Sequence, residues 1–243
     1  MLRALQYGML PSLFYSEDPW LDLKDYCGEY LKEEIQAEGL VRNIPAFVSF
    51  LELAALSNAE QISYSTIARD CGVTYKTVAE YYQILEDTLL GYFLEPWKKS
   101  KKRQSIQTRK FYFFDCGIPH ILLGRRLSEK THDFGKSFEH FLILETIAAM
   151  FYEKKIEKIH YWRSTSGYEV DLIINEEIGV EFKSGRIHPS DAKGLLALEE
   201  DLPLKKKWIV GQEVLPRIFE NGIEVLPWQL YLERIRDPSL CSG

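Results

Sequence analysis

The feature that most constrains this chain is a pair of runs that combine charged and apolar residues and are separated by five residues. The runs are Glu169-Val-Asp-Leu-Ile-Ile174 and Val180-Glu-Phe-Lys183. Their aliphatic residues predict two β-strands joined by a short turn. Because alternate side chains of a strand share a face, we expect Asp171 on the face opposite to Val170 and Leu172.

A turn centred near Glu176 places Asp171 opposite Glu181, and Glu169 opposite Lys183. The β-carbons of Asp171 and Glu181 would then lie about 5 Å apart. Two carboxylates this close repel each other at neutral pH unless they share a proton or a cation. Mg²⁺ or Mn²⁺ suits them because these ions prefer oxygen ligands and retain water, whose pKa they lower. Lys183 would stabilise negative charge on a phosphate, so the pattern predicts phosphodiester cleavage.

The alternative interpretation is a charged ladder on a solvent-facing side of the sheet. In that arrangement Glu169 and Lys183 form a cross-strand ion pair and have no chemical role. The ladder accounts poorly for Asp171 opposite Glu181, since like charges directly across a ladder destabilise it.

The two runs resemble the bipartite motif of PD-(D/E)XK nucleases, although Val170 stands where that family often has proline. The surrounding pattern is also similar to the αβββαβ core of the family. The predicted elements are a helix at Gly135–Glu153, strands at Ile159–Arg163, Glu169–Ile174 and Val180–Lys183, a helix capped by Ser190 that runs towards Glu200, and a strand at Lys207–Val210. The resemblance implies that Asp171 and Glu181 are metal ligands and that Lys183 is the catalytic lysine. It implies that Glu139 is a further acidic ligand or positions water.

A second pattern precedes this region. Ser65–Cys71 predicts a short helix, Gly72 and Val73 a tight turn, and Thr74 the cap of a second helix. Helix, glycine turn and helix form a helix-turn-helix. Predicted strands at Leu89–Pro96 and Phe111–Phe114 then flank a basic segment where a wing would lie.

The basic segment Lys98–Lys110 holds seven basic residues and no acidic one, although the chain has a net charge of −6. Positive charge focused in one segment favours contact with phosphates, and the start of a second helix is where such folds meet base edges. The residues expected to bind nucleic acid, with DNA favoured, are Tyr75, Lys76, Thr77, Lys101, Lys102 and Arg103. The alternative is a winged helix that serves for packing or for protein contact.

A wider resemblance covers almost the whole chain. The motifs that carry it are Tyr30-Leu-Lys-Glu-Glu-Ile35, Ile67-Ala-Arg-Asp70, Val78–Tyr82, Leu85-Glu-Asp-Thr88, Phe113-Phe-Asp-Cys-Gly117 and Tyr161-Trp-Arg163. Together they resemble the uncharacterised C-terminal region of prokaryotic AAA-type ATPases, a winged helix followed by a nuclease-like domain. In that family an ATPase module precedes this region. Gly135-Lys-Ser137 is only a partial phosphate-binding loop, so we predict no ATP site within this chain.

The resulting prediction is an α+β protein, with a helical and winged-helix N-terminal part and a restriction-endonuclease-like αβββαβ domain. The expected segments are a helical lead-in at 1–43, a winged helix-turn-helix domain at 44–128 and the nuclease-like domain at 129–243. Two functions stay open: a metal-dependent nuclease, or a catalytically inactive DNA-binding or protein-interaction module that regulates a partner ATPase. The apolar runs are shorter than a membrane helix, and the scattered cysteines predict a cytoplasmic protein.

Overall fold

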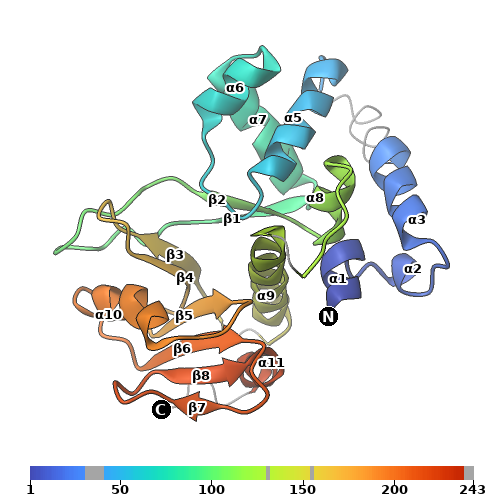
Figure 1. Ribbon diagram of the computed structural model, residues 1–243. Helices are drawn as coiled ribbons and strands as arrows, with labels where there is room; N and C mark the ends of the chain where they lie inside the picture. The colour runs from blue at the N-terminus through green and yellow to red at the C-terminus, as the bar shows by residue number, and fades with distance from the viewer. Residues whose placement is uncertain (31–40, 130–131, 154–155, 238–243) are drawn as a thin grey trace. The chain divides into compact units, whose positions relative to one another are not determined.

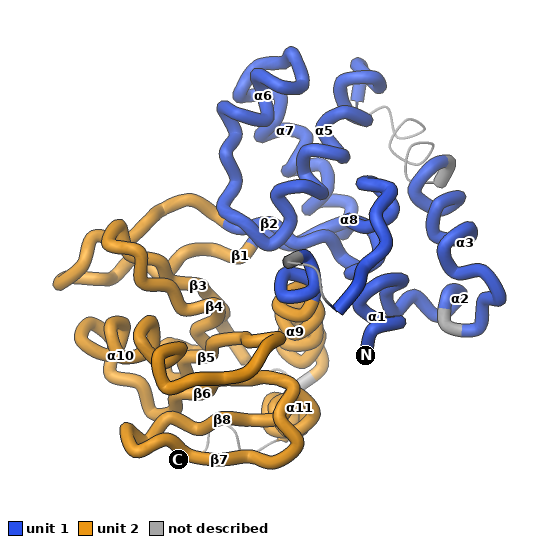
Figure 2. The backbone as a smooth tube through the Cα atoms, in the orientation of Figure 1, with its two compact units in different colours: residues 1–93, 110–137 blue, residues 94–109, 138–243 orange. Residues whose placement is uncertain are grey.

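The computed structural model of the protein describes residues 1–30, 41–129, 132–153 and 156–237 (Figure 1). It is a mixed α+β structure, as predicted. The chain divides into two compact units (Figure 2). Unit 1 comprises residues 1–93 and 110–137, and unit 2 comprises residues 94–109 and 138–243. Positions 31–35 of the Tyr30–Ile35 motif lie outside the described residues.

Unit 1 is mainly helical. Its helices are α1 (Leu2–Tyr7), α2 (Pro11–Phe14), α3 (Pro19–Asp25), the π-helical turn η1 (Tyr26–Tyr30), α5 (Ile44–Leu56), α6 (Tyr64–Cys71), α7 (Tyr75–Asp87) and α8 (Gly117–Leu122). Strands β1 (Gly91–Leu94) and β2 (Lys110–Phe113) form a two-stranded sheet. The ring of Tyr82 on α7 lies edge-on to Phe50 of α5 at 4.8 Å and to Phe111 of β2 at 4.9 Å. These contacts fix α7 against the core of the unit.

Helices α6 and α7 follow each other through the predicted glycine turn. Gly72 ends α6 with φ at 65°, a left-handed conformation that a residue with a β-carbon adopts only with strain. Thr74 caps α7, because its hydroxyl accepts a hydrogen bond from the backbone N–H of Thr77 at 3.1 Å. Both features were predicted from the sequence and are confirmed.

Within the described residues, unit 2 contains one six-stranded sheet in the order β3-β4-β5-β6-β8-β7. The strands are β3 (Ile159–Arg163), β4 (Glu169–Ile174), β5 (Ile178–Lys183), β6 (Lys206–Gly211), β7 (Arg217–Ile218) and β8 (Glu224–Pro227). Strands β3, β4 and β5 are antiparallel, while β5, β6 and β8 are parallel. The predicted succession of helix, three strands, helix and strand is confirmed.

Helices cover both faces of this sheet (Figure 1). The helices are α9 (His132–Glu153), η2 (Pro189–Ala192), α10 (Lys193–Glu199) and α11 (Trp228–Arg236). Leu195 and Leu198 of α10 pack in one buried cluster with Ile209 of β6. On the other face, Tyr231 of α11 contacts the ring of Phe182. The helix predicted to be capped by Ser190 starts differently: His188 caps the short 3₁₀-helix η2, which leads into α10.

The alternation of faces expected along β4 is interrupted. The pairing of β4 with β3 shifts register, so that Asp171 and Leu172 together lie opposite Tyr161. Two residues opposite one form a β-bulge. As a result Val170 and Ile173 belong to the same buried cluster, although strict alternation places them on opposite faces. The prediction of uniform alternation through β4 is therefore wrong at this point.

Residues 94–109, which we call the strap, connect β1 to β2 and pack with unit 2. The backbone of Tyr161 in β3 accepts a hydrogen bond from Trp97 N–H at 2.7 Å and donates one to the carbonyl of Glu95 at 3.1 Å. Further along β3, the carbonyl of Arg163 accepts from Ile106 N–H at 2.8 Å. The strap thus satisfies backbone groups on the outer edge of β3, which an edge strand otherwise leaves unpaired.

Asp201 anchors the most basic part of the strap. Its carboxylate accepts hydrogen bonds from the Ser100 hydroxyl and from the backbone N–H groups of Lys101 at 2.9 Å and Lys102 at 2.7 Å. Although partial burial acts in the opposite direction, these hydrogen bonds hold the pKa of Asp201 below its usual value. Arg103 pairs with Glu200 at 2.7 Å. The strap therefore packs with unit 2. The predicted winged-helix domain at 44–128 included this segment, so that boundary differs from the compact units.

We expect Asp201→Ala to loosen the strap, because one substitution removes the acceptor shared by three donors. Trypsin should then cleave the Lys98–Lys110 segment several-fold faster than in the unaltered protein. The free energy of unfolding should fall by about 1–2 kcal/mol, the contribution of hydrogen bonds to a partly exposed charged group. Timed proteolysis with mass spectrometry and urea denaturation measure the two effects.

The control is Asp70→Ala, which removes a carboxylate that is exposed in unit 1 and pairs with the adjacent Arg69. Cleavage rates within the strap should match those of the unaltered protein. Equal rates for the Asp201 and Asp70 variants would show that Asp201 does not anchor the strap.

Candidate functional site

The candidate site lies where β4 and β5 separate. The pairing of these strands ends at Leu172 and Val180, and Asp171 and Glu181 are the next residues along the two strands. Beyond this point β4 stays paired with β3, while β5 stays paired with β6. The turn is centred at Glu176 as predicted. The ladder ends before the two predicted pairs, however, so Asp171 and Glu181 are adjacent to its last pair, and Glu169 lies opposite Arg163 of β3 instead of Lys183.

Asp171 links the two strands through its side chain. Its Oδ2 atom accepts a hydrogen bond from the backbone N–H of Phe182 at 2.8 Å, and only 8% of the residue is exposed. A charge-assisted bond of this kind orients the carboxylate and offsets part of the cost of its burial. The Asp171 side chain therefore connects β4 to β5 directly after the last pair of the two strands.

Glu181 and Lys183 form an ion pair along β5. The Nζ atom of Lys183 donates to Oε1 of Glu181 at 2.7 Å. Glu181 is 8% exposed, and its other carboxylate oxygen, Oε2, is buried without a hydrogen-bond partner among the described residues. Buried polar atoms nearly always have partners, so this oxygen marks Glu181 as a position shaped by something other than stability.

Several charges act on this pair. Burial raises the pKa of Glu181 to about 7; the ammonium of Lys183 opposes the rise, whereas the carboxylates of Glu169 and Glu139 add to it. Although burial lowers the pKa of Lys183, Glu181 and Asp171 raise it further than burial lowers it. The predicted site residues on α9, β4 and β5 thus lie within electrostatic reach of one another.

The donor set suits a hard divalent cation. Asp171 and Glu181 offer only oxygen atoms, and Oε2 of Glu181 has no competing partner among the described residues. Within those residues, however, no group of three His, Cys, Asp or Glu side chains is arranged to hold a metal ion. This agrees with the internal partners already present, Lys183 on Glu181 and the Phe182 N–H on Asp171. An ion here would compete with Lys183 for Glu181.

The ion pairs differ from those of a simple charged ladder. Lys183 pairs with the glutamate on its own strand, and Glu169 pairs with Arg163 of β3 at 3.3 Å. Sequence reasoning gave no role to Arg163 or to Asp191, whose charge also raises the pKa of Lys183. A signal for Asp191 was present in the sequence, because it lies three residues after His188, the spacing of a capping box.

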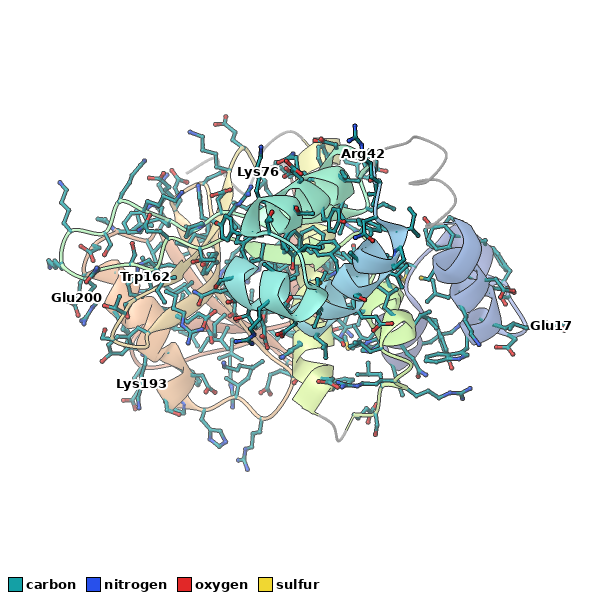
Figure 3. All side chains as sticks on the ribbon, turned by 90° about the horizontal axis from the view of Figure 1, so that it is seen from above. Glu17, Arg42, Lys76, Trp162, Lys193 and Glu200 are labelled. Atoms are coloured by element: carbon teal, nitrogen blue, oxygen red, sulfur yellow. The ribbon has the colours of Figure 1, made fainter. Side chains whose placement is uncertain are left out.

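The residues predicted to bind nucleic acid from α7 have different environments. Tyr75 is 59% exposed. The side chain of Lys76, which is labelled in Figure 3, is 87% exposed, and its Nζ atom lies 3.8 Å from Oε1 of Glu80. Thr77 is engaged in the cap of α7, where its hydroxyl shares a hydrogen bond with Thr74 at 2.9 Å. Tyr75 and Lys76 are therefore the members of this group whose side chains are available to a ligand.

The predicted contacts from the strap divide in the same way. The side chains of Lys101 and Lys102 are exposed, although their backbone N–H groups are bound to Asp201. Arg103 pairs with Glu200 and lies over the ring of Tyr168 at 4.9 Å. The two lysines present free charge to solvent, whereas Arg103 serves to hold the strap.

Comparison with known proteins gives the following similarities. Residues 1–129 match the model of Domain of unknown function (DUF8612), and residues 134–231 match that of Domain of unknown function (DUF4143). The chain is 28% identical over 199 residues to Uncharacterized protein Rv2008c of Mycobacterium tuberculosis and to Uncharacterized protein Mb2031c of Mycobacterium bovis. Each match covers 79% of this chain and 43% of the relative, so the chain spans less than half the length of these relatives.

No solved structure matches the chain. Among the described residues, none of the helices has both the length and the apolar character needed to cross a membrane.

The raised pKa of Glu181 predicts a pH dependence of stability. The pKa of about 7 keeps this carboxyl protonated in the folded protein up to about pH 7, whereas the unfolded chain releases the proton near the ordinary glutamate pKa of 4.5. The folded state therefore binds more protons between these values, and its stability falls as pH rises through them. Relative to Glu181→Gln, we expect a loss on the order of 3 kcal/mol across this window and no further change above it.

Urea denaturation of both proteins from pH 4.5 to pH 8, in the presence of EDTA, measures this difference. Glu177→Gln serves as the control, since Glu177 is a partly exposed partner of Lys205 in the β4–β5 turn. Parallel curves for the unaltered protein and Glu181→Gln would show that the Glu181 carboxyl is not perturbed.

Proposed function

The chain belongs to the family described as Domain of unknown function (DUF8612). We propose that this protein is a metal-dependent nuclease that hydrolyses phosphodiester bonds. One observation carries the proposal. The Glu181–Lys183 ion pair, with an unpartnered buried oxygen on Glu181, lies next to Asp171 at the point where β4 and β5 separate. Acidic and basic groups buried together with strongly shifted pKa values are typical of catalytic sites.

We also infer the two finer fold assignments. The order α9, β3, β4, β5, α10, β6 supports a PD-(D/E)XK nuclease fold for unit 2. The order α6, glycine turn, α7, β1, β2 supports a winged helix in unit 1. In such a winged helix, Tyr75 and Lys76 would face the groove of DNA.

The proposed chemistry divides among the site residues. Mg²⁺ or Mn²⁺ held by Asp171 and Glu181, with Glu139 as a further ligand or a residue that positions water, would supply a water molecule of lowered pKa. Lys183 exchanges its contact with Glu181 for the negative charge that develops on the phosphate. The Phe182 N–H, which donates to Oδ2 of Asp171, would hold that carboxylate in a fixed orientation.

Nucleic acid is the proposed substrate, with DNA favoured. Lys101 and Lys102 are exposed on the strap within the same unit as the site, so their charge is available to phosphates. Lys76 of unit 1 is exposed as well. The interaction should weaken steeply with salt, since each phosphate contact releases counterions.

We further propose that the chain corresponds to the C-terminal region of an AAA-type ATPase family protein and acts with an ATPase module. The greater length of its relatives supports this. Within the chain, Gly135, Lys136 and Ser137 lie inside helix α9, and Lys136 pairs with Glu60. They are therefore not proposed as an ATP site.

A second candidate is a catalytically inactive module that binds DNA or a protein and regulates a partner ATPase. Two observations favour it. Lys183 occupies one oxygen of Glu181, and the acidic side chains of the described residues do not gather in a group of three. In this case Asp171 and Glu181 would be structural, and their substitution would leave binding to DNA unchanged.

Cleavage assays with single- and double-stranded DNA and RNA in Mg²⁺ or Mn²⁺ test the nuclease proposal. Asp171→Asn and Lys183→Met should each reduce the cleavage rate at least about a hundredfold, the usual effect of removing a group that stabilises the transition state. Glu177→Gln, in the β4–β5 turn, should cleave like the unaltered protein. Cleavage that survives Asp171→Asn would exclude the proposed site.

Calorimetry with Mn²⁺ separates the two candidates. A nuclease should take up Mn²⁺ and lose this uptake in Asp171→Asn, while Glu177→Gln retains it. Absence of both uptake and cleavage in the unaltered protein would instead favour the inactive module.

A further inference from the structure

Arg163, at the end of β3, is held on both sides. In the sheet it lies opposite Glu169 of β4, and its Nη1 atom is 3.3 Å from the carboxylate of Glu169. On its other side its carbonyl accepts a hydrogen bond from Ile106 of the strap. The preceding residue, Trp162, is completely buried. The backbone of Arg163 therefore has little freedom, and the direction of its side chain is set by Glu169.

This arginine flanks the candidate site. Glu169 precedes Asp171 by two residues on β4, next to the bulge. The charge of Glu169 also contributes to the raised pKa of Glu181, which places its carboxylate within electrostatic reach of the site. Gly194 at the start of α10 packs against the carbonyl of Glu169, where a β-carbon would overlap it, so this end of β4 is closely supported.

The guanidinium of Arg163 remains accessible. Its side chain is 42% exposed, and Glu169 is the carboxylate that pairs with it among the described residues. A guanidinium has five N–H donors in a rigid plane, so one carboxylate leaves most of them available. The geometry of the plane suits two oxygens of a phosphate, and an arginine held in advance loses little entropy when it binds them.

We infer that Arg163 binds a backbone phosphate of the nucleic-acid strand that crosses the site, and that Glu169 is its positioning residue. Glu169, which holds the guanidinium, precedes Asp171 by two residues on β4, so Arg163 lies beside the site and does not belong to the proposed metal ligands. Arg163 would thus hold a phosphate that flanks the one that is cleaved. The inference rests on the proposed function, but the binding of DNA by Arg163 can be measured separately from cleavage.

The alternative is an exposed cross-strand ion pair with no ligand. Such pairs contribute about 0–1 kcal/mol to stability and nothing to binding. The Arg236–Glu145 pair of the same unit provides the matched control, since its arginine is 56% exposed and its glutamate 22% exposed. Arg163→Gln and Arg236→Gln therefore remove the same group from similar surroundings.

The experiment measures binding of a fluorescent single-stranded 20-nucleotide DNA by anisotropy over a range of salt concentrations in Ca²⁺ buffer. Arg163→Gln should weaken binding about tenfold and reduce the salt dependence by about one phosphate contact, a slope change of roughly 0.7. Arg163→Lys should restore part of the affinity, because it keeps the charge without the planar fork. Glu169→Gln should weaken binding less than Arg163→Gln does, and Arg236→Gln should bind like the unaltered protein.

Cleavage kinetics and calorimetry complete the test. In Arg163→Gln, KM should rise about tenfold while kcat stays within twofold, and Mn²⁺ affinity should be unchanged. If Arg163→Gln and Arg236→Gln bind DNA equally well, the inference is overturned, whether or not the protein is a nuclease. Loss of Mn²⁺ uptake in Arg163→Gln would also overturn it, because the arginine would then support the metal site itself.

If the unaltered protein neither cleaves nor takes up Mn²⁺, the nuclease proposal fails on its own. The difference in DNA binding between Arg163→Gln and Arg236→Gln then still decides whether Arg163 contacts phosphate.

Discussion

A carboxyl group is costly to bury unless it has a partner, and unit 2 buries two of them, Asp171 and Glu181, one position beyond the last pair of β4 and β5. Their partners explain the shape of the sheet at this end. The Phe182 N–H turns to Asp171, and the ammonium of Lys183 turns to Glu181. The outer partners of the two strands, β3 and β6, then hold them where they separate. Because apolar residues in place of a buried ion pair are often at least as stable, stability does not account for these groups.

The bulge in β4 belongs to the same arrangement. It inserts an extra residue at Asp171, where the strand leaves its pairing with β5. Bulges bend a strand and redirect a side chain, and they are common next to active sites. Around this point the protein combines a raised pKa, an unpartnered buried oxygen and an irregular strand. Each of these three features costs stability locally. Their occurrence at one point supports a functional site more strongly than any one of them does alone.

Much of the local structure could be predicted from the sequence. The bounds of β3 and β4 agree with the predicted ones, because runs of β-branched and aromatic residues end at a serine-rich turn and at Asn175. The neighbourhood of Asp171 and Glu181 followed from the turn near Glu176, since the register of a hairpin is fixed by its turn. The bulge was missed because alternation within one strand says nothing about its pairing with β3.

Other features depend on contacts between distant residues. Asp201 accepts a hydrogen bond from the backbone N–H of Lys101, which is a hundred residues earlier in the chain. The charge of the basic segment does not predict that its partners lie within the same chain. In the site, the choice of Lys183 between Glu181 and Glu169 depends on side-chain rotamers, which spacing does not determine. Arg163 lies in the Tyr161-Trp-Arg163 motif, but its position opposite Glu169 depends on the register of β3 against β4, which the sequence of one strand does not determine.

The strap has a further consequence for how the chain can be divided. It leaves unit 1 after Phe93, contributes Trp97 to the buried core of unit 2 and returns at Lys110. The family models meet between residues 129 and 134, yet the compact units do not separate there. A polypeptide cut at that junction would carry Trp97 away from its core and uncover the edge of β3. The two family matches therefore follow each other along the chain, whereas the segments of the two compact units alternate. A piece of the chain that is cut at the family boundary lacks a segment of one unit and carries that segment with the other.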